Sequence, residues 1–252
     1  MSGSLTGHIG NRVFNTISAA LLDIFFPRFC LGCNMYGVWV CDACRQKLPR
    51  YMPRPLYFVN YTAHLSAIRA AYSYDHWLTR SIVHTCKYQG IRDLAAIMAS
   101  ALAHELSYIP TYDQECLLIP VPLHESKLRE RGFNQAELIA TRLAGMIGAQ
   151  INTNAVARVR STRTQVTLNR KQRKENVRQA FACVDPLSVA GRKIILIDDI
   201  STTGSTLSEL AGIVRSSGAV EVSGLVFAHG TLPNVKDRAL LVDHPTESFY
   251  YS

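Results

Sequence analysis

Two adjacent carboxylates and a hydroxyl-rich turn stand near the C-terminal end of the chain, directly after a run of aliphatic residues. Asp198 and Asp199 follow Ile-Ile-Leu-Ile at 194–197, and an amphipathic helix is expected from residue 205. Backbone N–H groups at the start of a helix are unsatisfied and lie at the positive end of the helix dipole, so they attract anions, and a glycine there lets the backbone approach the anion closely. The pattern therefore predicts a phosphate-binding loop formed by Thr202, Thr203, Gly204, Ser205 and Thr206.

The two acids need a different partner, because carboxylates repel a phosphate. They can accept hydrogen bonds from the hydroxyls of a ribose, directly or through Mg²⁺. The plain alternative is that the hydroxyl side chains cap a helix and the acids occupy a turn. Either feature alone favours that alternative, whereas the combination favours a phosphorylated ribose as the ligand.

The whole segment resembles the 5-phosphoribosyl-1-pyrophosphate (PRPP) loop of type I phosphoribosyltransferases. The resemblance implies that Asp198 and Asp199 bind the ribose, that residues 202–206 bind its 5-phosphate, and that Mg²⁺ accompanies the PRPP. Family members that act on purine bases often place a further carboxylate in this loop as a general base, but the position here is Thr202. A threonine is no base at neutral pH, so the resemblance predicts PRPP binding and leaves transfer and its acceptor open.

Four of the seven cysteines form two C-x-x-C pairs, which are separated by seven residues. Four sulfurs at this spacing can converge on one ion in the tetrahedral arrangement that zinc prefers. We therefore predict a structural Zn²⁺ site, because four thiolates leave no open position for catalysis, and a redox dithiol is the alternative. The expected ligands are Cys30, Cys33, Cys41 and Cys44.

A concentrated positive segment lies between residues 158 and 178, where eight basic residues stand against the single acid Glu175. It could contact nucleic acid or a pyrophosphate-bearing substrate, and a solvated helix face is the third interpretation. The residues that we predict to contact nucleic acid are Arg163, Arg170, Lys171, Arg173 and Lys174.

A second segment, residues 120–135, follows an apolar strand with prolines, basic residues and a glycine, and it could hold pyrophosphate. In an enzyme, a nucleophile would displace pyrophosphate from C1 of the ribose through an oxocarbenium-like transition state. Asp198 and Asp199 would then fix the ribose, and Lys87, Arg129 or Arg131 would stabilise the leaving charge. A structural role is expected for His124.

The order of the motifs resembles a narrower family, the ComF (GntX) family. They are the cysteine pairs, Lys-Tyr-Gln-Gly at 87–90, Pro-Val-Pro-Leu-His at 120–124, Arg-Glu-Arg-Gly-Phe-Asn-Gln at 129–135, the block at 165–181 and the phosphate loop. The resemblance implies a phosphoribosyltransferase-like protein of natural competence that handles imported single-stranded DNA together with competence-machinery proteins. The alternative is an enzyme that moves phosphoribose to an unidentified acceptor and releases pyrophosphate.

The elements that position these groups alternate between strand and helix. Apolar runs predict strands at 67–74, 116–121, 155–159, 193–197 and 220–227, and helical spacing predicts helices at 77–88, 93–106, 133–147 and 205–216. Wholly apolar strands indicate a parallel sheet with both faces covered. The expected fold class is α/β, of the type I phosphoribosyltransferase kind, with a small zinc-ribbon-like N-terminal module.

We expect two domains, with a proline-rich linker at the boundary. Residues 1–55 would form the module, which begins with an amphipathic stretch at 13–25, and residues 56–252 would form the phosphoribosyltransferase-like domain. No apolar run reaches the roughly 18 residues of a membrane span. The paired cysteines suit a reducing compartment, so we expect a cytoplasmic protein. The formal net charge of +8 permits polyanionic partners.

Overall fold

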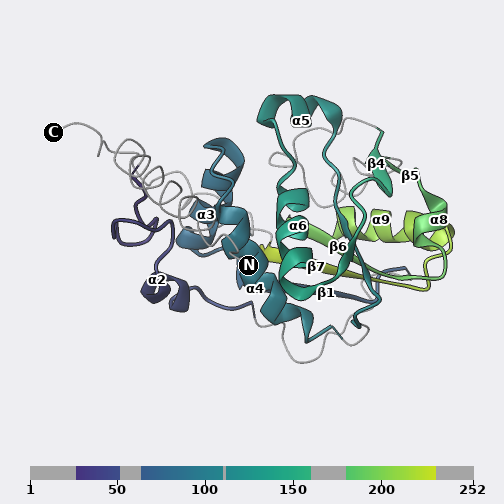
Figure 1. Ribbon diagram of the computed structural model, residues 1–252, viewed down its shortest axis with the longest axis horizontal. Helices are drawn as coiled ribbons and strands as arrows, with labels where there is room; N and C mark the ends of the chain where they lie inside the picture. The colour runs from purple at the N-terminus through teal and green to yellow at the C-terminus, as the bar shows by residue number, and fades with distance from the viewer. Residues whose placement is uncertain (1–26, 52–63, 110–111, 160–179, 231–252) are drawn as a thin grey trace, which may run out of the picture.

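The computed structural model describes residues 27–51, 64–109, 112–159 and 180–230. Within these residues, five strands form a sheet in the order β1-β7-β6-β2-β3, and every neighbouring pair is parallel (Figure 1). The central strands β6 and β7 are almost wholly buried along their length, because helices cover both faces of the sheet. The strands are β1 (Ala67–Ser73), β2 (Leu117–Pro120), β3 (Gln150–Ile151), β6 (Lys193–Ser201) and β7 (Glu221–His229).

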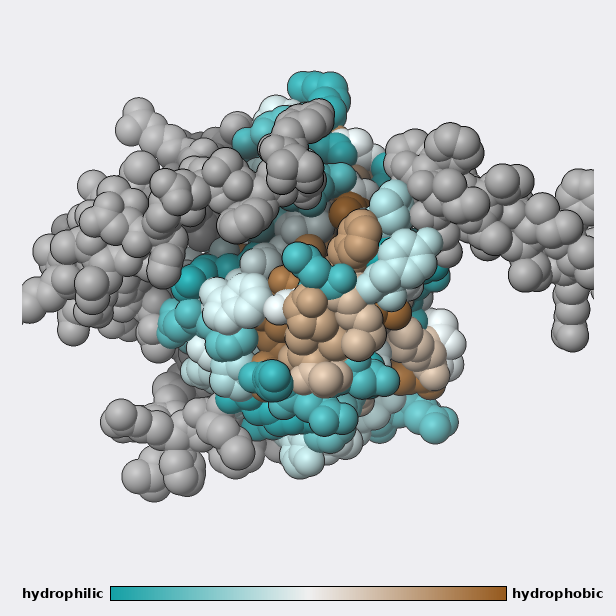
Figure 2. All heavy atoms as spheres, turned by 90° about the vertical axis from the view of Figure 1, so that its left-hand side faces the viewer, coloured by the Kyte–Doolittle hydropathy of each residue, from teal (hydrophilic) through white to brown (hydrophobic). Residues whose placement is uncertain are grey.

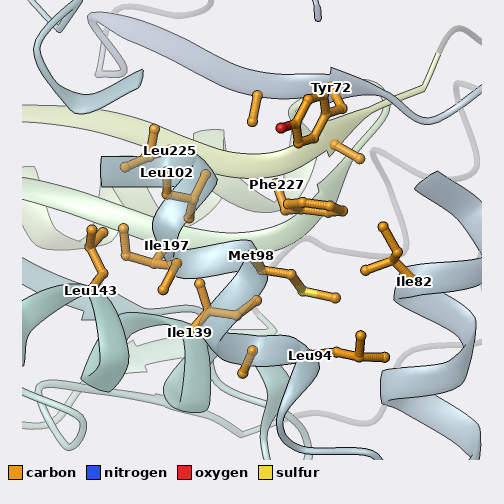
Figure 3. Close-up of a cluster of buried hydrophobic side chains, with 14 of the residues drawn as sticks. Tyr72, Ile82, Leu94, Met98, Leu102, Ile139, Leu143, Ile197, Leu225 and Phe227 are labelled. Atoms are coloured by element: carbon orange, nitrogen blue, oxygen red, sulfur yellow. The ribbon is translucent and has the colours of Figure 1, made fainter. Parts of the chain in front are cut away.

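Alternate side chains of the central strands belong to two separate hydrophobic cores, one on each face of the sheet. On one face, α4 (Leu94–Leu106) and α6 (Gln135–Ile147) pack against Ile197 and Phe227, and α3 (Trp77–Tyr88) closes the same cluster (Figure 3). On the other face, α9 (Ser205–Ser216) packs through Leu210 against Leu196 and Val226. This arrangement follows from the period of two in a strand, which sends neighbouring side chains to opposite faces.

The cysteine module packs directly on the first of these cores. The module contains α2 (Asp42–Gln46). Three of its four paired cysteines lie in one buried cluster with Leu78 and Ile82 of α3. Hydrophobic residues also gather at the surface on this side of the molecule (Figure 2). Among the exposed apolar side chains of the module are Phe29, Met35 and Val38.

The chain that leaves the module runs beside β1. The amide of Tyr51 donates to the carbonyl of Ala71 at 3.0 Å, and the amide of Ser73 donates to the carbonyl of Pro49 at 3.1 Å. The predicted domain boundary at residue 55 and the predicted helix at 13–25 lie outside the described residues, so both stay predictions.

The predicted fold class, a parallel sheet flanked by helices beside a small four-cysteine module, is confirmed. One predicted strand was placed in the wrong sheet: β4 (Val156–Arg158) pairs antiparallel with β5 (Phe181–Cys183) in a separate two-stranded ribbon. Three short helices were not predicted: α2, α5 (Glu125–Arg131) and α8 (Pro186–Val189). Across the described ranges, no helix is long and apolar enough to cross a membrane.

Candidate functional site

The two acids occupy the end of strand β6. The sequence predicted a strand to residue 197 followed by a loop, but β6 continues to Ser201, which pairs with His229 of β7. That prediction was wrong because backbone pairing with β7 continues past the last aliphatic residue of the run. The amide of Asp199 donates to Oδ1 of Asp198 at 2.8 Å, and both carboxylates line a cavity beyond the strand end.

This cavity has a volume of about 390 Å³ and lies at the carboxyl end of the parallel strands, where open α/β sheets bind their ligands. Its walls come from three parts of the chain. They are the last turns of α3 with Tyr74, the segment from Val121 to Ala136, and the segment from Asp198 to Leu207, with Arg158 beside them.

Asp199 forms a buried ion pair across the cavity. Its Oδ2 lies 2.7 Å from Nζ of Lys87, and the two side chains are only 8% and 18% exposed. Burial alone lowers the pKa of Lys87, but the charge of Asp199, the hydrogen bond between them and the charge of Asp198 outweigh burial, so the pKa is raised. Lys87 is therefore charged at neutral pH.

Asp198 is in a different electrostatic position. Burial and the neighbouring charge of Asp199 raise its pKa to about 7, although Lys87, the backbone amide and Arg158 act in the opposite direction. Arg158 itself stacks on the ring of Phe181 at 5.3 Å from the centroid. The carboxyl group of Asp198 thus titrates near neutral pH, and its charge is the one that a ligand or a cation can change.

The predicted phosphate loop keeps a tight turn before α9. Gly204 has φ 70°, a left-handed conformation that glycine adopts without steric cost, and it is the N-cap of α9. The hydroxyl of Thr203 donates to Oγ of Ser205 at 2.9 Å and accepts the amide of Ser205 at 3.3 Å. All of the residues 202–206 line the cavity, so the start of a 12-residue helix is directed at it.

The opposite wall carries buried polar groups at the start of α6. Gln135 is 2% exposed, its Oε1 accepts Nη1 of Arg131 at 3.0 Å, and its Nε2 has no hydrogen-bond partner among the described residues. Nε of Arg131 is also buried and unpartnered within that set, and its guanidinium lies over the ring of Tyr88. Buried donors in proteins usually have a hydrogen-bond acceptor. An anionic ligand in the cavity would supply acceptors for these two donors.

Neighbouring side chains hold this wall in place. Asn134 caps α6 by accepting the amide of Ala136 at 3.1 Å, and its Nδ2 donates to the carbonyl of Val121 at 3.1 Å. His124 caps α5, because its Nδ1 accepts the amide of Ser126 at 3.2 Å. His124 therefore has a structural contact, as the sequence suggested.

The predicted site residues are only partly brought together. Asp198, Asp199, Lys87, Arg131 and the whole phosphate loop line the cavity. Arg129 does not: it pairs with Glu125 on the exposed side of α5. The predicted nucleic-acid residues between 163 and 174 lie outside the described residues. Sequence reasoning gave no role to Gln135, and the signal that could have found it is the Asn-Gln pair at the start of an apolar helix.

The four cysteines converge as predicted. Their sulfur atoms all lie within 4.8 Å of one another, and the sulfurs of Cys33 and Cys41 are 3.6 Å apart. Zn–S bonds of about 2.3 Å in a tetrahedron place sulfurs about 3.8 Å apart, so the donor set fits one Zn²⁺. Burial raises the pKa of Cys30, but the backbone amides of Cys41 and Gly32 outweigh burial and lower it to about 6. A thiolate is thus favoured at the sulfur that the knuckle backbone surrounds.

Gly32 offers a direct test of this packing. A Cβ at this position would lie 2.6 Å from Sγ of Cys44 and 3.2 Å from Leu78 of α3. Gly32→Ala should therefore displace a zinc ligand, weaken metal retention and destabilise the protein by about 1–3 kcal/mol, measured by metal analysis and thermal unfolding.

Gly145→Ala is the matched control for Gly32→Ala. Gly145 is exposed in α6, and a Cβ there meets nothing within 4 Å. That variant should keep its metal and gain about 0.5–1 kcal/mol, because alanine is the better helix former. Equal behaviour of the two variants would contradict close packing at Gly32.

No protein-family model matches the chain. Among solved structures, a purine phosphoribosyltransferase from Pyrococcus horikoshii aligns with 54% of this chain and 82% of its own at 15% identity and a TM-score of 0.33. An allosteric regulatory enzyme of purine biosynthesis aligns with 53% of this chain and 26% of its own at 19% identity and a TM-score of 0.34.

The curated relatives are closer in sequence. The DNA utilization protein YhgH of Salmonella typhi is 31% identical over 188 residues, which is 72% of this chain and 74% of that protein. Competence protein F of Haemophilus influenzae is 29% identical over 78% of this chain and 82% of its own. Competence protein ComFC of Bacillus subtilis is 27% identical over 60% and 58%. With likeness of this extent along both proteins, the chain belongs to the ComF family.

Proposed function

We propose that this protein binds PRPP with Mg²⁺ and acts in natural transformation, in the handling of imported single-stranded DNA. The observation that supports PRPP binding is a single cavity. Two carboxylates at the end of a strand line it together with the start of a helix that has a glycine as its N-cap. Carboxylates accept hydrogen bonds from the ribose hydroxyls, and the N–H groups of the helix start donate to the 5-phosphate. Neither group alone selects this ligand, whereas together they line one cavity and offer partners for both the hydroxyls and the phosphate of a ribose 5-phosphate.

The remaining groups of the cavity suit the pyrophosphate end. Arg131 and Gln135 supply buried donors, and the oxygens of Asp198 and Asp199 are the ligands that Mg²⁺ prefers. When bound, Mg²⁺ would neutralise part of the pyrophosphate charge. The test is a calorimetric titration of the full chain with PRPP and Mg²⁺. Binding is expected, and a folded protein that does not bind would contradict the proposal.

The role in transformation rests on the relatives, two of which are named competence proteins and one a DNA utilization protein. The basic segment at 158–178 is the proposed contact for single strands. Such binding should weaken steeply with salt, because Lys and Arg release counterions from the phosphates.

A variant in the basic segment tests this contact. Neutralising Arg170, Lys171, Arg173 and Lys174 should lower the affinity for a short single strand and flatten its dependence on salt concentration, measured by fluorescence anisotropy. An unchanged affinity in both experiments would exclude this segment as the contact.

Transfer of phosphoribose is the second candidate function. Buried donors at the start of α6 favour it, because they could stabilise a departing pyrophosphate. Pyrophosphate release in the presence of candidate acceptors tests this function, and its absence with every acceptor would leave binding alone.

A further inference from the structure

The two adjacent acids of β6 do not have equivalent surroundings. Asp199 belongs to the set of strand residues that faces α3, and its carboxylate is fixed by Lys87 at 2.7 Å. Asp198 is offset to the other side of the strand, as the period of two requires, and its pKa, which burial raises, is lowered in part by Arg158 as well as, more strongly, by Lys87. Lys87 is therefore hydrogen-bonded to Asp199 and acts on Asp198 only through its charge, whereas Arg158 is a second cation near Asp198.

The buried position of Lys87 limits what its ammonium group can reach. The side chain is 18% exposed and comes from the last turn of α3, whose first turn carries Leu78 in the core beneath the cysteine module. The buried donors without partners lie instead at the start of α6, on Arg131 and Gln135. The unpartnered donors thus come from a different part of the chain than the ion pair, although the guanidinium of Arg131 lies over the ring of Tyr88, the residue next to Lys87.

We propose that Lys87 is a positioning residue for the ribose subsite: it holds the carboxylate of Asp199 oriented toward the ribose hydroxyls, and it does not contact the pyrophosphate. The inference rests on the proposed binding of PRPP. One oxygen of Asp199 is taken by the ammonium group, which leaves the other for a hydroxyl of the ligand. Without Lys87, the carboxylate of Asp199 would lose the partner that fixes its position, and ligand binding would have to order it.

Three probes separate this role from contact with a leaving group. PRPP with Mg²⁺ contains both parts of the ligand, ribose 5-phosphate lacks the pyrophosphate, and inorganic pyrophosphate with Mg²⁺ lacks the ribose. In Lys87→Met, the affinities for PRPP and ribose 5-phosphate should fall by the same factor, about tenfold to a hundredfold. The affinity for pyrophosphate should fall much less, because Arg131 and Gln135 supply its donors, and Lys87→Arg should restore most of the loss.

Lys193→Met is the matched control. Lys193 also pairs with an aspartate, Asp113 at 2.6 Å, but it lies at the opposite end of β6 and is not part of the cavity wall. Its removal should leave all three affinities unchanged. A loss in Lys87→Met that affects PRPP and pyrophosphate but spares ribose 5-phosphate would overturn the proposal and assign Lys87 to the leaving group.

A second measurement needs no ligand. In a thermal double-mutant cycle, Lys87→Met and Asp199→Asn should be strongly non-additive, because each leaves the partner of the other buried and unpaired. Additive effects would show that the pair is not held together and would overturn the positioning role. The wild-type protein could also bind none of the probes while the cycle showed coupling. The proposed function would then fail, and the role of Lys87 in binding would be overturned with it, because the ion pair would be purely structural.

Discussion

Replacing Asp198 and Asp199 together by asparagine is expected to reduce the affinity for PRPP with Mg²⁺ by at least about a hundredfold. Each carboxylate would supply a charge-assisted hydrogen bond worth about 1.5–3 kcal/mol, and the pair also supplies the negative charge that holds the cation. Asparagine has nearly the same shape and keeps an acceptor for the amide of residue 199, which in the native protein donates to Oδ1 of Asp198 at 2.8 Å. Titration calorimetry measures the loss, and a cooperative thermal unfolding transition of the same double variant shows that it is still folded.

The affinity for PRPP should also depend on pH, and the direction of this dependence can be predicted. Burial and the charge of Asp199 raise the pKa of Asp198 to about 7, so much of this carboxyl group is neutral at pH 6 and most of it is ionised at pH 8. Only the ionised form accepts two hydroxyl hydrogen bonds or binds a cation well, so the affinity should rise with pH through 7. The ligand titrates too, and comparison with Asp198→Asn isolates the contribution of the protein. An identical pH profile in the variant would contradict the role of Asp198.

Much of the sheet could be predicted because its strands are buried on both faces. The run at 194–197 carries no polar residue, and such runs have few other stable structures. The extension of β6 to Ser201 could not be predicted in this way, because backbone pairing with β7 includes two acids that sequence patterns assign to loops. The same limit explains β4, since an apolar run does not say which strand it pairs with.

The site could be predicted only where its residues are consecutive. The loop at 202–206 is one continuous segment, so its residue types alone indicate a phosphate site. Lys87 could not be paired with Asp199 in this way, because it comes from a helix more than a hundred residues earlier in the chain. Arg129 and Arg131 show why neighbouring candidates differ. A helix turns about 100° per residue, so two positions apart lie almost on opposite sides, and only one of these arginines can face the cavity.

Removing the cysteine site should give the largest loss of stability. The double variant Cys30→Ser, Cys33→Ser leaves two of the four converging sulfurs and should lose about one zinc per chain, measured by metal analysis. Structural zinc contributes folding free energy directly, and loss of even about 4 kcal/mol would lower the melting temperature of a chain this size by roughly 10 °C. A chelator should lower the melting temperature of the wild-type protein in the same direction and leave the variant unaffected.

Cys183→Ser is the control, because Cys183 is partly buried on β5 and is not one of the four clustered sulfurs. It should keep its zinc and melt within a few degrees of the wild type. The effect of the double variant should also reach the cavity, since the clustered cysteines share one buried core with Leu78 and Ile82 of α3, the helix that ends in Lys87. If the zinc-free variant melted like the wild type, the four sulfurs would be a close cluster without a structural metal. If the zinc-free variant had a lower melting temperature but the same affinity for PRPP as the wild type, the position of α3 would depend on its packing against the sheet and not on the cysteine module.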